Sequence, residues 1–523
     1  MGIESVLSDL RVLVDKLYTE STINPGSYEE VSEVEKIRGI IESYLGVKTR
    51  VIEVPLLSWK LKSANLDPKP SFLGIAPYVE SGSVEGLWFR VEGNPVRLES
   101  WRSFPEGRVA IVNEPQDPDD IKSVVLHASE AGALAVIVES ESAPRAIVTN
   151  GYWGFNYRVG SPTPIPIVIV ERGYSSKLSS NNRISLSIDS RVIESTGYTI
   201  EANIPSSSDD IILIGAHHDK WYSGFSDDII GLAQAIITAK ILSESKLTVR
   251  LLSFTAEEYG ALGYASWYWA WGSRFYAKQL LDTDLIDKIR VYINYDMASL
   301  DPIIVSGSPQ YADLVLAEKR CCECPECDSF SLASIGIPTL CIHSLWSRKS
   351  RSIYHTPYDT PDKSDLRLAS EAVNKITKAI LEGPKWDYME KMIAETLGEG
   401  PLDARKIAYV ILSLAKRVGW SRLYIELARV ALKTIHYGSY RLDEVNLEAI
   451  WFPEVVVYVK LRNDIIKGIA PHEVWITGDE AILYTLRAAN GKPIPVEALA
   501  QQYKFNIEHL WSKIEDIQYR LLK

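Results

Sequence analysis

Apolar runs of strand length alternate with helical segments between residues 211 and 342. The run Ile211–Ala216 is apolar throughout, which is typical of a strand buried on both faces of a parallel sheet. The pattern then predicts a helix over Gly231–Leu242 and further strands over Val249–Phe254, Val291–Tyr295 and Ile337–Ile342. This alternation predicts an α/β fold with a doubly wound, mostly parallel sheet.

Potential metal ligands follow the carboxyl ends of these predicted strands. His217 follows the first strand, Glu258 the second and Asp296 the third. Because the carboxyl ends of strands border the binding crevice of an open α/β sheet, we expect these side chains to converge. The candidate ligands, in chain order, are His217, Asp227, Glu258, Asp296 and His355, with a second carboxylate, Glu257, beside Glu258.

This set has the composition of a two-zinc hydrolase site. Zn²⁺ binds imidazole nitrogen and carboxylate oxygen, and a catalytic site keeps one position open for water. Two metals about 3.5–4 Å apart need a shared ligand, which a carboxylate can provide and an imidazole cannot. A carboxylate outside the ligand set can then accept a proton from the attacking water. Taken singly, each residue also fits a structural role, such as Asp227 capping the helix that follows it.

The chain divides into segments with different patterns. Two predicted helices, Ile3–Tyr18 and Glu29–Tyr44, precede a strand at Thr49–Val54. Short strands punctuated by Pro and Gly follow Trp59, which indicates a separate module. The predicted domains are a catalytic domain over 1–60 and 183–383, an inserted β-rich module over 61–182 and a mainly helical unit over 384–523.

Charge and hydropathy restrict the partners. The chain has 56 Lys and Arg against 68 Asp and Glu, a net charge of −12, which disfavours nucleic acid as a partner. No apolar run reaches the roughly 18 residues of a membrane span. The N-terminal residues have the pattern of an amphipathic helix rather than of a signal peptide. We therefore expect a cytoplasmic protein that binds neither nucleic acid nor membrane.

The segments that carry the candidate ligands closely resemble the co-catalytic zinc exopeptidases, which include bacterial and archaeal aminopeptidases and glutamate carboxypeptidase. The resemblance covers Met1 to about Glu382. The step from His217 to Asp227 is most similar to the branch that contains glutamate carboxypeptidase and the transferrin receptor. That branch implies a protease-associated domain over 61–182 and a helical dimerisation domain over 384–523, and hence a homodimer. The segments that carry the resemblance to the zinc exopeptidases are Gly215–Trp221, Ser226–Asp228, Phe254–Gly260, Asn294–Met297 and Tyr354–Thr356.

The resemblance implies a role for each candidate residue. Asp227 would bridge two Zn²⁺ ions, and Glu257 would be the general base that later protonates the leaving amine. Asp219 would accept the other ring N–H of His217, and Tyr354 would donate a hydrogen bond to the tetrahedral oxyanion. The remaining ligands would be His217 and Asp296 at one ion and Glu258 and His355 at the other.

Departures from the family pattern affect the choice of metal. The family often has Asn after the bridging Asp and a small residue two places later, where this chain has Asp228 and Ile230. The extra carboxylate leaves other divalent ions, such as manganese or cobalt, as alternatives to zinc.

We expect a peptide substrate and an aminopeptidase, with three alternatives. A carboxypeptidase would need a cationic clamp, for which Arg348, Lys349 and Arg351 are candidates unless they form a solvated loop. A non-enzymatic receptor would be expected to lose ligands, and none is missing. Glutaminyl cyclisation uses a single zinc in related folds, whereas this ligand set favours two ions and hydrolysis.

Four of the five cysteines crowd into the segment Cys321–Cys327, and Cys341 follows. Zinc clusters usually come as two separated pairs, so this spacing is not typical of a structural metal site, although it permits one. Reduced thiols and one or two disulfides are the other interpretations.

Overall fold

The computed structural model describes residues 2–79, 81–95, 103–116, 121–140, 144–149, 165–262, 268–307, 318–319, 324, 326–345, 347–383, 402–419, 423, 508, 511–512 and 514–523. Their strands join into one mixed sheet, in the order β12-β11-β13-β10-β8-β9-β7-β3-β4-β5-β6-β2, with β1 paired to β7. The fold is therefore α/β with a mostly parallel sheet, as the sequence predicts.

Four parallel strands form the part of the sheet that carries the candidate ligands. They are β13 (Thr339–His343), β10 (Ile289–Asp296), β8 (Ile211–His217) and β9 (Thr248–Phe254), adjacent in that order. All four were predicted, with small differences at their ends. The antiparallel β11 (Ile304–Gly307) and the short β12 (Glu318–Lys319) extend one edge.

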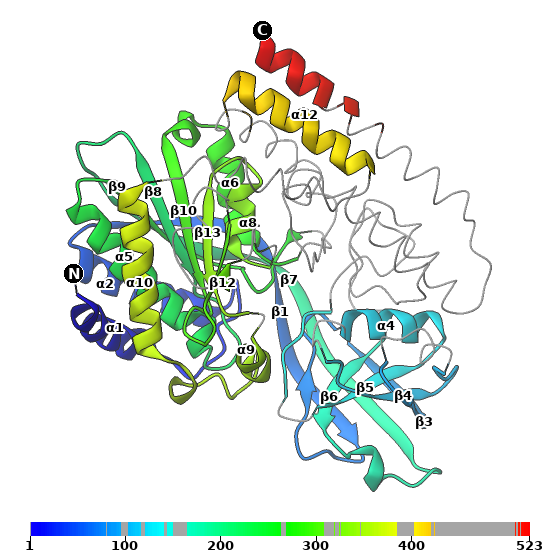
Figure 1. The fold of residues 1–523 in the computed structure, drawn as a ribbon. Helices are drawn as coiled ribbons and strands as arrows, with labels where there is room; N and C mark the ends of the chain where they lie inside the picture. Colours follow the sequence, from blue (N-terminus) through cyan, green and yellow to red (C-terminus); the bar gives the residue numbers. More distant parts are fainter. Residues whose placement is uncertain are drawn as a thin grey trace.

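Helices cover both faces of this part of the sheet (Figure 1). One face packs against α1 (Ile3–Leu17), α2 (Tyr28–Leu45), α5 (Ile230–Glu244) and α10 (Leu366–Glu382). The other face packs against α6 (Trp271–Leu281) and α8 (Asp328–Ala333). Helix α5 is apolar on nearly all sides because it lies between the sheet and the helices α1 and α10. This arrangement is the predicted doubly wound layout.

Two long strands connect the ligand-bearing half to a second module. Strands β1 (Thr49–Asp67) and β7 (Arg183–Ile204) pair antiparallel and run from one half to the other (Figure 1). The module contains the parallel strands β3 (Gly82–Arg90), β4 (Val109–Asn113), β5 (Ala135–Ser140) and β6 (Ile167–Glu171), the short β2 (Gly74–Ile75), and the helix α4 (Ile121–Glu130). Its assignment as a protease-associated domain, and the boundaries 61–182, stay predictions.

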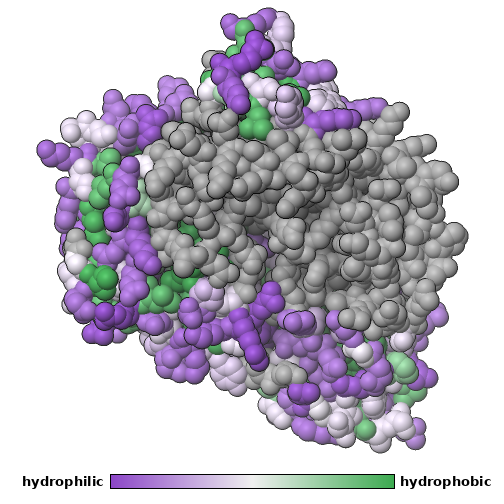
Figure 2. Space-filling view, in the orientation of Figure 1, coloured by the Kyte–Doolittle hydropathy of each residue, from purple (hydrophilic) through white to green (hydrophobic). Residues whose placement is uncertain are grey.

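The C-terminal third is described only in part. Helix α12 (Leu402–Val418) lies in the unit predicted to be mainly helical, over 384–523, most of which lies outside the described residues. None of the described helices has the length and apolar character needed to span a membrane. On the face shown in Figure 2, the described surface is largely hydrophilic, with apolar residues in small groups.

Candidate metal centre

The candidate ligands stand where the parallel strands end. His217 and Asp296 are the last residues of β8 and β10, and Glu257 and Glu258 lie just beyond β9. Asp227 lies in a short irregular turn, Phe225–Ile229, that leads into α5. His355 follows helix α9 (Arg348–Ile353). His217 and Asp227 share the connection from β8 to α5, so four separate connections deliver side chains to one edge of the sheet.

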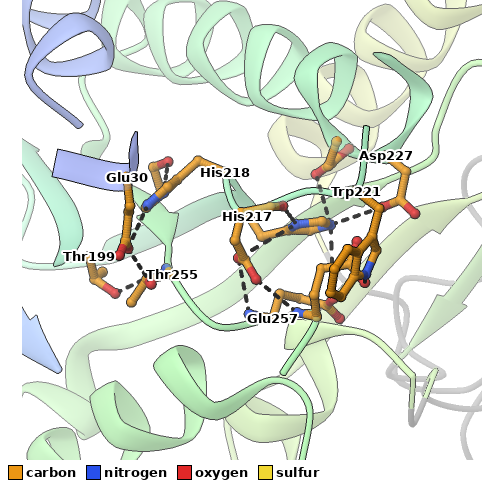
Figure 3. Close-up of polar contacts among 12 residues, drawn as sticks. Glu30, Thr199, His217, His218, Trp221, Asp227, Thr255 and Glu257 are labelled. Atoms are coloured by element: carbon orange, nitrogen blue, oxygen red, sulfur yellow. Dashed lines mark hydrogen bonds and ion pairs between the residues drawn. The ribbon is translucent and has the colours of Figure 1, made fainter. Parts of the chain in front are cut away.

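The carboxylate of Asp227 lies between the two histidines. Its Oδ1 is 3.2 Å from Nε2 of His217, and its Oδ2 is 3.4 Å from Nε2 of His355. Figure 3 shows His217 and Asp227 facing each other. Each oxygen thus faces a different imidazole, which is the arrangement that a bridging carboxylate requires.

Two groups of potential ligands share Asp227. One consists of His217, Asp227 and Asp296, and the other of Asp227, Glu258 and His355. In each group the ligand atoms all lie within 4.8 Å of one another. The predicted ligands therefore come together, divided between two positions as the resemblance implies.

Glu258 and His355 are held by neighbouring groups. The Glu258 carboxylate lies 2.9 Å from Nε2 of His355 and accepts a hydrogen bond from Nε1 of Trp221 at 2.8 Å. The Trp221 ring stacks on Tyr259 with ring centroids 5.3 Å apart. An aromatic wall thus fixes the orientation of one candidate ligand.

The electrostatics of the site fit a divalent cation. Burial raises the pKa of Glu257 and of Asp296 well above their ordinary values, and neighbouring carboxylates add to this. Burial alone would lower the pKa of His355, but Glu258 and Asp227 outweigh it and raise the pKa to about 10. Buried carboxylates at this density need positive charge among them, which protonated imidazoles supply here and metal ions supply equally well.

Asp227 differs from these neighbours. Burial raises its pKa, but the two flanking imidazoles outweigh that effect and lower the pKa below the ordinary value. The central carboxylate is thus held ionised. Oε1 of Glu258 is buried without a hydrogen-bond partner among the described residues. A buried oxygen in that state is available to a cation, so the donor set fits zinc.

Asp219 contacts His217 through its main-chain carbonyl and not, as expected from the sequence, through its carboxylate. Nδ1 of His217 pairs with the main-chain carbonyl of Asp219 at 2.9 Å, whereas the Asp219 carboxylate is 3.9 Å away. That carboxylate instead accepts the backbone N–H groups of Glu257 at 3.1 Å and Glu258 at 3.0 Å. Asp219 therefore positions both the histidine and the two glutamates.

Asp359 is a supporting residue that the sequence analysis missed. Its carboxylate accepts the backbone N–H groups of Ser226 at 2.8 Å and of Asp227 at 3.1 Å. It is buried, and burial together with the charge of Asp227 raises its pKa to about 7. The short step from His355 to Asp359 was the available signal, but an aspartate in a loop has no distinctive pattern.

The second module also contacts the loop that carries His355. Nδ1 of His355 pairs with the carbonyl of Ala146 at 2.9 Å, and the amide of Ala146 donates to the carbonyl of His355 at 2.9 Å. Arg145 donates to the carbonyls of Tyr354 and Arg351 and pairs with Glu114 at 3.0 Å. The segment 144–149 therefore fixes the ring orientation of one candidate ligand.

His218 points away from the metal centre, although it adjoins His217. Its Nδ1 lies 2.9 Å from Oγ of Ser253, and its Nε2 lies 3.4 Å from Glu30. Glu30 also accepts a hydrogen bond from Thr255 (Figure 3). This buried polar cluster joins helix α2 to the strand ends behind the site.

The two other residues singled out from the sequence lie beside the centre. The Tyr354 ring stacks on His355 with centroids 3.6 Å apart, and its role toward an oxyanion stays a prediction. Asp228 lies 4.0 Å from Nε2 of His217 and is buried. A Cβ on Gly231 would lie 2.0 Å from the Asp228 carboxylate, so only glycine leaves room for that carboxylate at the start of α5.

Comparisons with known proteins find one matching family model and similar folds. Residues 199–312 match the sequence model of peptidase family M28. No curated protein sequence matches the chain. One similar solved structure is a zinc aminopeptidase from Bacillus subtilis, with a TM-score of 0.55 and 16% identity over 74% of this chain and 96% of that one. Another is a peptidase M28 precursor from Shewanella amazonensis, with a TM-score of 0.55 and 18% identity over 72% of this chain and 94% of that one. An aminopeptidase from an Aneurinibacillus strain is also similar, with a TM-score of 0.50 and 20% identity over 73% of this chain and 94% of that one.

Proposed function

We propose that this chain, whose residues 199–312 match the model of peptidase family M28, is a two-zinc aminopeptidase. The metallopeptidase class follows from the family. The proposal adds the number of ions and the end of the peptide that is attacked. One observation carries it: the two oxygens of Asp227 face two different histidines, at 3.2 Å and 3.4 Å.

The donors divide naturally between two ions. His217 and Asp296 would hold one ion and Glu258 and His355 the other, with Asp227 shared. When bound, the zinc ions polarise the scissile carbonyl and lower the pKa of water towards about 7. The backbone carbonyls of Asp219 and Ala146 keep the imidazoles in the tautomer that leaves Nε2 free to bind.

Glu257 has the position and environment of the general base. Its carboxylate lies 4.0 Å from Nε2 of His217, and its backbone is fixed by the hydrogen bond to Asp219. Burial, aided by nearby carboxylates, raises its pKa well above the ordinary value. A carboxylate with a raised pKa accepts a proton from water readily and can donate it to the leaving amine, a contribution typically of about 10²–10⁴-fold.

The described residues show no cationic clamp for a substrate carboxylate, which favours an aminopeptidase over a carboxypeptidase. A carboxypeptidase needs a cation for the α-carboxylate, and no lysine or arginine among the described residues forms an ion pair with the candidate ligands. Arg348 and Lys349 are exposed, and Lys349 faces Asp301 at 3.9 Å.

A blocked-peptide panel tests which end is attacked. One tripeptide is offered with both termini free, with an acetylated N-terminus, or with an amidated C-terminus, to the zinc-loaded enzyme. We expect cleavage of the free and amidated forms and not of the acetylated form. Cleavage of the acetylated form with loss of activity on the amidated form would identify a carboxypeptidase instead.

Variants of two acidic residues test the mechanism. Glu257→Ala is expected to keep its zinc and to lose about 10²–10⁴-fold in rate, whereas Asp227→Ala should lose zinc as well. The exposed Glu53→Ala is the control for loss of a surface carboxylate. Full activity in Glu257→Ala would end the assignment.

A further inference from the structure

Three cysteines lie together beside the metal centre but outside its ligand set. Cys324 and Cys327 precede helix α8, and Cys341 lies within strand β13. All three are buried, and their sulfur atoms lie within 4.8 Å of one another. The thiols are free rather than joined in a disulfide.

We propose that Cys324, Cys327 and Cys341 bind a structural zinc ion, separate from the two ions of the metal centre. In tetrahedral zinc–thiolate sites the Zn–S distance of about 2.3 Å sets neighbouring sulfurs about 3.8 Å apart. The observed limit of 4.8 Å is therefore compatible with the site after small movements of the side chains.

The local backbone brings the thiols together. The amide of Cys327 donates to the carbonyl of Cys324 at 3.2 Å, and the amide of Phe330 donates to the carbonyl of Cys327 at 3.1 Å. The resulting turn holds both ends of the Cys-x-x-Cys segment against β13, which α8 also contacts. In structural zinc sites, two of the ligands commonly come from a Cys pair spaced like this one.

The surroundings of Cys341 suit a thiolate. Nδ2 of Asn294 lies 3.7 Å from Sγ of Cys341, as a donor to that sulfur. Burial raises the pKa of Cys341, but hydrogen bonds from the thiols of Cys324 and Cys327 outweigh it and lower the pKa well below the ordinary value. The three sulfurs lie close to one another, so a cation bound among them would replace thiol protons.

Among the described residues, Glu326 is the candidate for the fourth position, which water could also fill. Oε2 of Glu326 lies 3.4 Å from Sγ of Cys324, close to the S···O separation of about 3.5 Å expected between two ligands of one zinc ion. Glu326 is not within 4.8 Å of all three sulfurs, so its side chain would have to turn to complete a tetrahedron.

Such a site would brace the edge of the metal centre. Cys341 pairs in register with Asn294 of β10, the strand that ends in Asp296. Helix α8 packs against both strands. A metal that joins the start of α8 to β13 would therefore stiffen the sheet directly behind one catalytic ligand.

Metal analysis and zinc-edge X-ray absorption on the full-length enzyme, purified with reductant and zinc, test the proposal. We expect about three zinc ions per chain and sulfur neighbours at about 2.3 Å. Zinc without sulfur neighbours would overturn the site, as would a disulfide among these cysteines found by mass spectrometry of protein kept under the same conditions. This measurement does not depend on any variant folding.

Two variants separate this site from the metal centre. Asp227→Ala should keep about one zinc ion with sulfur neighbours. Cys341→Ser should lose the sulfur signal and retain the remaining zinc. If Asp227→Ala lost all sulfur-bound zinc, or Cys341→Ser kept it unchanged, the independent site would be refuted. A failure of the two-zinc proposal would lower the total zinc content but leave the sulfur-bound zinc, and so the two failures are distinguishable.

Discussion

Replacing Asp359 by asparagine should weaken zinc binding around Asp227 by about 10–100-fold. The Asp359 carboxylate accepts two backbone N–H groups, from Ser226 at 2.8 Å and Asp227 at 3.1 Å. Asparagine has one acceptor oxygen, so one buried N–H loses its partner. A hydrogen bond to a charged acceptor contributes about 1.5–3 kcal/mol, which corresponds to about 10- to 150-fold in affinity.

The assay is competition for zinc against a chromophoric chelator at pH 8. Because the pKa of Asp359 is raised to about 7, mainly by burial, the wild-type carboxylate is ionised at that pH. Asp362→Asn is the matched control, since Asp362 is exposed in the same loop. An unchanged dissociation constant in Asp359→Asn would refute the view that this carboxylate positions the bridging residue.

Two further predictions concern the histidines and the second module. Zinc uptake by the metal-free enzyme should release protons, because both histidines are protonated at neutral pH. Against the effect of burial, Glu258 and Asp227 raise the pKa of His355 to about 10. Against the same effect, Glu257 and Asp227 raise the pKa of His217 well above its ordinary value. Zinc affinity should therefore rise with pH through neutrality, and calorimetric heats that do not depend on the buffer would contradict this. Arg145→Met should lower the free energy of unfolding by about 3–5 kcal/mol, because it leaves the nearly buried Glu114 without its cation. The control is Arg183→Met, which breaks the exposed pair of Arg183 with Glu85 and should change the free energy of unfolding by less than about 0.5 kcal/mol. If denaturant titrations gave the same change for both variants, the claim that Arg145 stabilises the nearly buried Glu114 would be refuted.

The strand ends explain why most ligands could be predicted from the sequence. Residues 211–216 form a continuous apolar run, and such a run must be buried and must end where the first polar side chain, His217, appears. The same logic holds for Asp296 at the end of β10. Their convergence then follows from the parallel order of the strands rather than from any single motif.

The supporting contacts could not be predicted because they depend on tertiary approach. Ala146 and His355 are 209 residues apart, and nothing in the local sequence of either indicates that they pair. The role of the Asp219 carboxylate was missed for a related reason. Its oxygens accept hydrogen bonds from backbone N–H groups, which every residue type except proline has, so the sequence does not mark them. The three-cysteine cluster likewise depends on β13 lying beside the turn at Cys324.

The central claim is that two zinc ions share Asp227. Crystals grown with zinc and measured on both sides of the zinc absorption edge test it directly. We expect two anomalous peaks about 3.5–4 Å apart, one beside each oxygen of Asp227, with His217 at one ion and His355 at the other. A single peak, or two peaks with Asp227 bound to neither or to one alone, would contradict the shared-carboxylate account.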